Sequence, residues 1–187
     1  MGPLIRLGNA AGAAGIATIL MVAFGLQFGL NEPPCPLCNL QRAAFVLCGF
    51  GFVLNLRFGI QPLHYGLVLL GALFGLATSG YQTLLHIAPG AAAYGAPFLG
   101  LHLYTWSLIA FLVVIAAVAV LMVLSGRPEH DRTDHRVALR FRGVYKLAAY
   151  LLIAATLANA ANSFLLCGPV ECPDNPTSYW ISNHLPS

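Results

Sequence analysis

The sequence predicts an all-α membrane protein: a four-helix transmembrane bundle followed by a fifth, C-terminal transmembrane helix. Of its 187 residues, 58% are apolar and only 8% are charged, whereas soluble domains carry about 25% charged residues. A transmembrane helix needs about 20 apolar residues. Intervals of 25, 69 and 24 residues without charge provide them, between Arg6 and Glu32, Arg57 and Arg127, and Lys146 and Glu171. Low charge also excludes an intrinsically disordered chain.

The first two spans are predicted near residues 8–30 and 40–57. The first follows Arg6 and is longer than the apolar part of a signal peptide, so we expect a permanent transmembrane helix. The second is shorter, because Arg42 and Arg57 enclose only 14 residues. Its ends must therefore reach the headgroup region, where a long arginine side chain can extend toward water.

The other three spans are predicted near residues 63–86, 104–125 and 145–166. The long uncharged interval divides at Pro89-Gly90, because proline followed by glycine breaks a helix. Lipid offers the backbone no hydrogen-bond partners, so each span should be helical. The predicted organisation is a bundle over 1–126, a basic loop over 127–143, and the fifth helix with its tail over 144–187.

The distribution of Lys and Arg predicts the orientation of the spans. Eight of the nine basic residues fall on flanks that five spans place on one side, and the positive-inside rule makes that side cytoplasmic. Residues 31–39, residues 87–103 and the tail from Cys167 then face outward. Only Arg42 breaks the pattern. Acidic residues are interleaved in the basic loop, so we interpret it as an orientation signal beside lipid and not as a nucleic-acid-binding patch.

A CxxC motif, Cys35 to Cys38, opens the second span on the predicted outer side. This spacing permits a disulfide within one helical turn. The unpaired amides at a helix N-terminus stabilise a thiolate. Arg42 lies one turn after Cys38 and would stabilise the thiolate further. Cys48 falls in the middle of the span and is predicted to be a small core residue.

Cys167 and Cys172 form a second pair directly after the fifth span. An oxidising outer compartment would let disulfides persist, but four cysteines allow three pairings, and the spacing does not decide among them. The two pairs could serve only as structural disulfides. A zinc site is disfavoured by the loose second spacing and the oxidising compartment, so no metal is predicted. Two outward pairs beside a membrane-level arginine favour redox chemistry.

Two motifs resemble a known family. Residues 35–42, Cys-Pro-Leu-Cys-Asn-Leu-Gln-Arg, are similar to the Cys-x-x-Cys-x-x-x-Arg signature of the DsbB family, the quinone-dependent disulfide bond formation proteins of bacterial inner membranes. Phe98-Leu99-Gly100-Leu101, followed by Trp106, is a second match. The resemblance covers roughly residues 8–125.

The resemblance implies a thiol:quinone oxidoreductase of the bacterial inner membrane, with a cytoplasmic N-terminus and a periplasmic CxxC loop and tail. Its partner would be a periplasmic DsbA-like thiol oxidase or a dedicated client, and its cofactor ubiquinone or menaquinone. On matching positions, Cys38 would contact the quinone and Cys35 would exchange with incoming thiols. Arg42 would hold a quinone carbonyl, and Gln82 or His86 would approach the ring.

The sequence departs from the family in the position of its second cysteine pair. The family places this pair between the third and fourth spans, where residues 87–103 contain no cysteine. We therefore hypothesise that Cys167 and Cys172 act as the shuttle pair. Three alternatives stay open: a cysteine-based metal-handling protein, a non-catalytic membrane subunit with structural disulfides, and a vitamin K epoxide reductase-like quinone enzyme. The quinone-enzyme alternative is disfavoured because the CxxC of vitamin K epoxide reductase-like enzymes belongs late in the bundle, whereas here the CxxC follows the first span.

Overall fold

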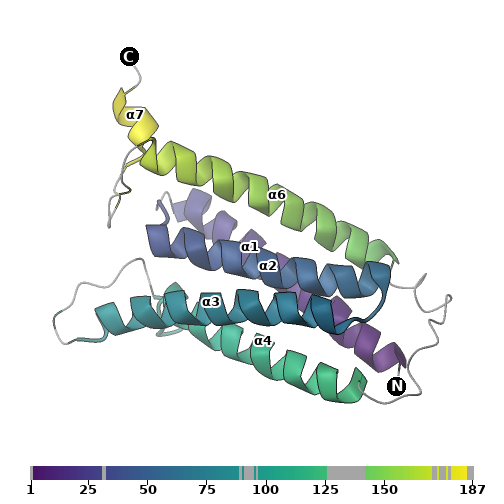
Figure 1. Cartoon of the computed structure of the whole chain (residues 1–187). Coiled ribbons are helices and arrows are strands. Elements are labelled where there is room, and N and C mark those ends of the chain that lie inside the picture. Colours follow the sequence, from purple (N-terminus) through teal and green to yellow (C-terminus); the bar gives the residue numbers. More distant parts are fainter. Residues whose placement is uncertain are drawn as a thin grey trace.

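Helices dominate the part of the chain that the computed structural model describes, which is residues 2–30, 33–88, 90, 95, 97–125, 142–169, 172, 176 and 178–184 (Figure 1). The helices are α1 (Gly2–Leu30), α2 (Pro36–Phe58), α3 (Pro62–His86), α4 (Leu103–Ser125), α6 (Arg142–Cys167) and α7 (Trp180–His184). Five of them are long and apolar enough to cross a membrane. The predicted fold class, an all-α membrane bundle with an added C-terminal helix, is therefore confirmed.

The helix boundaries agree with the predicted spans except at the N-terminal ends of α1 and α2. α1 begins at Gly2 and not near residue 8, so that Arg6 lies within the helix. α2 begins at Pro36 and not near residue 40, which places Cys38 in its first turn. Most of the basic loop predicted over 127–143 lies outside the described residues, as does much of the connector after α3.

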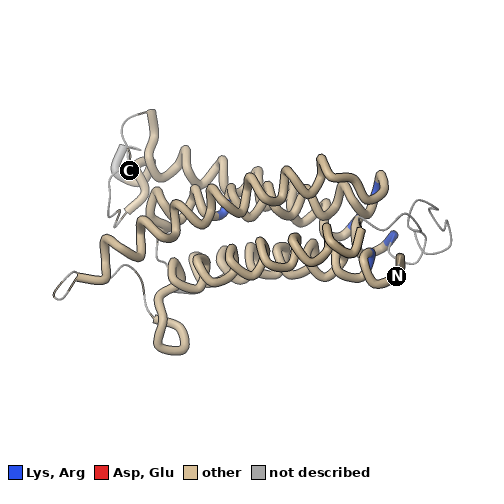
Figure 2. Tube along the Cα trace, turned by 60° about the horizontal axis from the view of Figure 1, so that its bottom comes forward, with Lys and Arg blue, Asp and Glu red and all other residues tan. Residues whose placement is uncertain are grey.

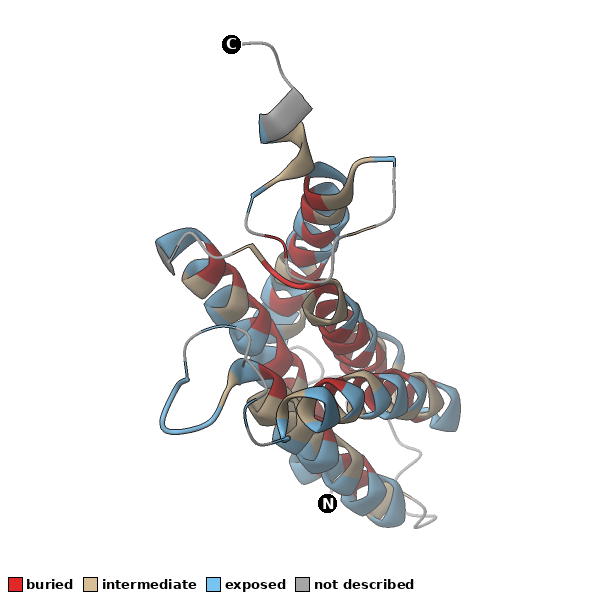
Figure 3. Ribbon diagram, turned by 90° about the vertical axis from the view of Figure 1, so that its left-hand side faces the viewer, coloured by how far each residue is buried: buried red, intermediate tan, exposed pale blue. Residues whose placement is uncertain are grey.

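α2 lies at the centre of the bundle, in contact with α1, α3 and α6, while α4 packs against α3. In Figure 1, α6 and α4 lie on opposite sides of the α1–α2 pair. The buried faces of the helices turn toward one another (Figure 3). Each long helix contributes an almost fully buried large side chain to this interior, namely Leu20, Phe52, Tyr65, Phe111 and Leu152. α4 is the least buried of the five, as expected for an apolar helix in contact with lipid.

A glycine lets α2 and α3 approach closely. A Cβ atom on Gly71 would lie only 3.1 Å from both the Ala44 carbonyl oxygen and the Cys48 Sγ. Small residues favour helix association in membranes because they let the backbones come together. Cys48 is a free, fully buried thiol whose Sγ donates to the Val68 carbonyl at 3.4 Å. Its predicted place in the core is confirmed.

The basic residues of the described part gather at one end of the bundle, with one exception (Figure 2). This end carries the N-terminus, and we call it the N-terminal end. The exception is Arg42, which lies on α2 toward the opposite end, where Cys35 and Cys38 begin that helix. We call this opposite end the cysteine end. The charge asymmetry on which the predicted orientation depends is thus present in three dimensions, while the orientation itself stays a prediction.

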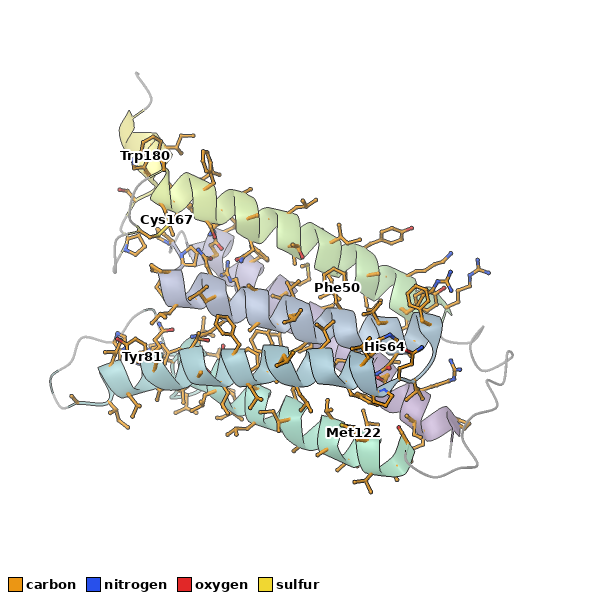
Figure 4. The ribbon with its side chains drawn as sticks, in the orientation of Figure 1. Phe50, His64, Tyr81, Met122, Cys167 and Trp180 are labelled. Atoms are coloured by element: carbon orange, nitrogen blue, oxygen red, sulfur yellow. A yellow bond between two sulfur atoms is a disulfide. The ribbon has the colours of Figure 1, made fainter. Side chains whose placement is uncertain are left out.

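A buried polar cluster joins α1, α2 and α3 at the N-terminal end, where Figure 4 labels His64. Asn55 Nδ2 donates to Asn9 Oδ1 at 2.9 Å, and Asn55 Oδ1 accepts from the Gln61 backbone N–H and from His64 Nδ1, both at 3.0 Å. Asn9 Nδ2 also donates to the Tyr65 hydroxyl at 2.8 Å. The cluster was not predicted, although an asparagine within an apolar span indicates a polar contact between helices.

We expect Asn55→Leu to destabilise the fold without acting on the cysteine end. The substitution removes the shared partner of Asn9, Gln61 and His64, and a buried polar group left unpaired costs about 1–3 kcal/mol. Unfolding in mixed detergent micelles should show a loss of about this size in the free energy of unfolding. Thr156→Val is the matched control, because its hydroxyl bonds only to a carbonyl of its own helix. Equal stability of the two variants would contradict the prediction.

Candidate functional site

A disulfide joins Cys35 to Cys38 where α2 begins. Cys35 is the N-cap, with an extended backbone (φ −69°, ψ 161°), and its Sγ accepts the backbone N–H of Cys38 at 3.1 Å. Pro36 suits the first helical position because the N–H that proline lacks would be unpaired there anyway. The sequence predicts that the helix N-terminus acts on the Cys38 thiolate, whereas in the structure the backbone N–H of Cys38 donates its hydrogen bond to the Cys35 Sγ.

Gln82 of α3 is the side chain that reaches this disulfide. Its Nε2 donates to the Cys35 Sγ at 3.2 Å and lies 3.8 Å from the Cys38 Sγ. Gln41 Nε2 donates to Gln82 Oε1 at 2.7 Å, which turns the Gln82 amide nitrogen toward the two sulfurs. Both glutamines are at most 4% exposed. A buried, oriented N–H donor therefore lies beside the CxxC, where it can stabilise negative charge on sulfur.

His86 lies one turn after Gln82 and faces α4. Its Nδ1 is 2.8 Å from the Gln82 carbonyl oxygen. A carbonyl only accepts, so Nδ1 carries the hydrogen and Nε2 is an acceptor in the neutral ring. The ring centre of Tyr104 lies 5.2 Å from that of His86 and 5.3 Å from that of His102. The two residues predicted on the third span, Gln82 and His86, thus both lie at the cysteine end.

Arg42 turns toward α1 instead of toward the disulfide. Its Nη1 donates to Gln27 Oε1 at 2.5 Å, and its Nη2 donates to the Ala23 carbonyl at 3.1 Å. The guanidinium carbon lies 4.6 Å from the centre of the Phe24 ring, close enough for a cation–π contact. Arg42 is 8% exposed. A guanidinium removed from water needs acceptors, and α1 provides them. The hydrogen bonds near the sulfurs are therefore made by glutamines.

Two asparagines of α6 connect this helix by hydrogen bonds to α1 and to the first turn of α2. Gln27 Nε2 donates to Asn162 Oδ1 at 2.7 Å, and Asn162 Nδ2 donates to Asn39 Oδ1 at 3.3 Å. Asn159 Nδ2 donates to the Asn39 carbonyl at 3.1 Å. Asn159 and Asn162 thus both bond to side chains or backbone of neighbouring helices. α6 thus contacts the first turn of α2, immediately after the CxxC.

A second disulfide joins Cys167, the last residue of α6, to Cys172. Of the three ways in which these four cysteines can form two disulfides, the structure has the one that joins the members of each close pair. The C-terminal end of α6 and the N-terminal end of α2 lie at the same end of the bundle (Figure 1). Within the described residues, no three His, Cys, Asp or Glu side chains gather in a way that could hold a metal ion.

The described residues of the tail contact α1 and α6. Gly168 has a φ of 62°, and its backbone N–H closes the last turn on the Phe164 carbonyl at 2.8 Å. The Tyr179 hydroxyl lies 2.9 Å from Gln27 Nε2. Trp180 packs over Gly168, and Figure 4 shows it close to Cys167. Neither Gln27 nor Tyr179 was predicted as a functional residue. The sequence feature that could have indicated Gln27 is the presence of a glutamine near the end of an apolar span.

A family model described as "Disulfide bond formation protein DsbB" matches residues 6–96. The match covers α1, α2 and α3, and with them the CxxC, Arg42, Gln82 and His86. It ends before the Phe98–Leu101 motif that also carried the resemblance. The fifth helix and the cysteine-containing tail lie outside the matched residues.

Curated relatives bear the same name. "Disulfide bond formation protein B" of Cupriavidus metallidurans is 29% identical over an alignment of 141 residues that covers 59% of this chain and 86% of the relative. The protein of that name from Ralstonia nicotianae is 39% identical over 84 residues, 44% of this chain and 49% of the relative. "Disulfide bond formation protein B 2" of Pseudomonas syringae is 42% identical over an alignment of 80 residues that covers 38% of this chain and 43% of the relative. The chain thus spans most of the first relative and about half or less of the other two. No solved structure is significantly similar.

Proposed function

Because the chain is a multi-span membrane protein that resembles the DsbB family, we propose that it is a thiol:quinone oxidoreductase of the bacterial inner membrane. Its partner is a periplasmic DsbA-like thiol oxidase or a dedicated client, and the cysteine end faces the periplasm. The observation that carries the proposal is the disulfide at the start of α2, beside the buried N–H donor of Gln82. Ubiquinone or menaquinone, when bound, accepts two electrons and two protons.

The side chains at the cysteine end fit a quinone ring, which has hydrogen-bonding oxygens on a flat apolar body. His86 and Tyr104 offer aromatic surface from α3 and α4, with ring centres 5.2 Å apart. His86 Nε2 can accept a hydrogen bond from a quinol hydroxyl, because Nδ1 is engaged with the Gln82 carbonyl. Arg42 stays a proposed ligand of a quinone carbonyl. To act so, it would exchange the oxygen of Gln27 for that carbonyl.

The reaction is a sequence of thiol–disulfide exchanges that ends at the CxxC. A thiolate of the reduced partner attacks the Cys167–Cys172 disulfide, and a mixed disulfide resolves to leave the partner oxidised and the tail as a dithiol. The tail dithiol then reduces Cys35–Cys38 in the same way. The Gln82 amide lies within 3.8 Å of both sulfurs and can stabilise whichever leaves as a thiolate. Cys38 then passes the two electrons on, and the CxxC disulfide forms again.

The proposal predicts a fixed stoichiometry with purified protein in detergent. One quinone should be reduced for each dithiol oxidised, because each transfer moves two electrons. The quinone is followed by its absorbance, and free thiols are titrated in the same samples. Two controls use boiled protein and protein depleted of quinone. Thiol oxidation that proceeds unchanged without quinone, or no quinone reduction by any dithiol or dithiol protein, would contradict the proposed function.

A further inference from the structure

Gln27 on α1 contacts both segments that carry cysteine pairs. Its Oε1 accepts from Arg42 on α2, while its Nε2 donates to the Tyr179 hydroxyl in the tail at 2.9 Å and to Asn162 on α6 at 2.7 Å. A guanidinium has only donors, so the amide oxygen must face Arg42 and the amide nitrogen must face the other two groups. Gln27 is 5% exposed. Its bonds are therefore made where water competes little.

The same network continues to the turn that carries the CxxC. The Tyr179 hydroxyl donates to Asn162 Oδ1 at 3.3 Å, and Asn162 Nδ2 donates to Asn39 Oδ1 at 3.3 Å. Asn39 follows Cys38 directly, and its backbone N–H donates to the Cys35 carbonyl at 3.1 Å. A hydroxyl of the tail is thus connected by side-chain hydrogen bonds to the first turn of α2.

The tail is held on both sides of its second cysteine. Before it, Cys167 ends α6, and Gly168 turns the chain with a φ of 62°. After it, Tyr179 enters the polar network and Trp180 covers Gly168 so closely that a Cβ there would collide with the indole ring. Cys172 lies between these two attachments. The described part of the tail is therefore anchored to α1 and α6, in addition to its covalent link to α6.

We propose that Gln27, Asn162 and Tyr179 form a clamp that holds the tail against the start of α2, so that the tail disulfide can exchange with the CxxC. The inference rests on the proposed function, in which the tail pair is the shuttle. In the exchange, the tail dithiol loses two electrons and two protons and becomes the Cys167–Cys172 disulfide. The Cys35–Cys38 disulfide gains them and becomes a dithiol. The clamp residues touch no sulfur; they are positioning residues that raise the effective concentration of one pair at the other.

The test measures that effective concentration in the full chain, without quinone or partner. Two backgrounds, Cys38→Ser with Cys167→Ser and Cys38→Ser with Cys172→Ser, each leave Cys35 and one tail cysteine. The proteins are equilibrated in glutathione buffers, and alkylation followed by mass measurement gives the fraction joined in a disulfide between Cys35 and the tail. Cys48 is buried within α2 and does not interfere. Tyr179→Phe removes two hydrogen bonds of the clamp and should lower the cross-linking equilibrium constant about 5- to 30-fold.

Tyr150→Phe is the matched control, because it also removes one tyrosine hydroxyl, here from a side chain of α6 that is 70% exposed. This variant should leave the constant unchanged. Equal cross-linking equilibrium constants for Tyr179→Phe and Tyr150→Phe would overturn the proposed clamp. So would the lack of any cross-linked form in both backgrounds that keep Tyr179. Since the measurement needs no quinone, its failure is distinguishable from a failure of the proposed oxidoreductase activity, which the quinone stoichiometry tests separately.

Discussion

Replacing Cys38 with serine is expected to reduce dithiol-driven quinone reduction to the uncatalysed background. Enzymes accelerate their reactions by roughly 10⁶-fold or more, so the loss should span several orders of magnitude. The physical reason is that a hydroxyl neither forms the disulfide with Cys35 nor exists as an anion at neutral pH, as a thiolate does. The rate is measured by quinone absorbance, with saturating quinone and a small dithiol that does not need the tail.

Cys48→Ser is the matched control for this prediction, because Cys48 is the free, buried cysteine of the same helix. It should keep most of the activity, even if it loses some stability. The alternative of a non-catalytic subunit with structural disulfides predicts the reverse pattern for Cys38→Ser: a lower unfolding temperature and unchanged electron flow. Quinone reduction by Cys38→Ser at the rate of the unaltered protein would refute the catalytic role.

The fold was predictable from the sequence because charge is so expensive in a bilayer. The spacing of Arg6, Arg57 and Lys146 in the sequence delimited the spans, and all five spans appear as helices. The start of α1 differs from the prediction because a charge was expected to lie outside a span. The sequence predicts that the first span begins after Arg6, but Arg6 is only 7% exposed and lies inside α1. Position in sequence does not reveal when a charge is enclosed by neighbouring helices.

The sequence indicated which residue types gather at the candidate site, but it did not indicate which neighbouring helix each side chain faces. The CxxC, Gln82 and His86, which the resemblance implied as site residues, all lie at one end of the bundle, and their roles stay predictions. Gln41 and Arg42 are adjacent, and adjacent residues of a helix point about 100° apart. One must face α3 when the other faces α1. Which one does so depends on how the helices pack, and that arrangement cannot be derived from one sequence.

Gln82→Leu is expected to slow oxidation of a small dithiol about 10- to 100-fold at saturating quinone. A hydrogen bond to a charged group contributes about 1.5–3 kcal/mol, and the Gln82 N–H is the side-chain donor that lies 3.2 Å from the Cys35 Sγ. When an incoming thiol attacks Cys35, the sulfur that leaves as a thiolate is that of Cys38, which is half-buried and lies 3.8 Å from Gln82 Nε2. Without the amide, this thiolate loses its stabilisation. Gln61→Leu is the matched control, because Gln61 precedes the same helix and its side chain makes no capping bond.

The kinetic form of the loss separates two roles for Gln82. If its amide acts on sulfur, kcat falls while the KM for quinone stays nearly constant. If it binds quinone alone, the KM for quinone rises and the rate recovers at high quinone concentration. Recovery of the full rate at saturating quinone would therefore contradict the sulfur contact.

Gln82→Glu sharpens the test of the sulfur contact, because it keeps the size of the side chain and an oxygen that can accept from Gln41, while replacing the donor by an acceptor. A carboxylate beside the sulfurs would repel a thiolate, so this variant should be slower than Gln82→Leu. Gln41→Leu should fall between Gln82→Leu and the unaltered protein. The Gln82 amide remains, but nothing then holds its nitrogen toward the disulfide. This order of rates follows from the direction of one N–H group, and a merely structural role for the two glutamines would not produce it.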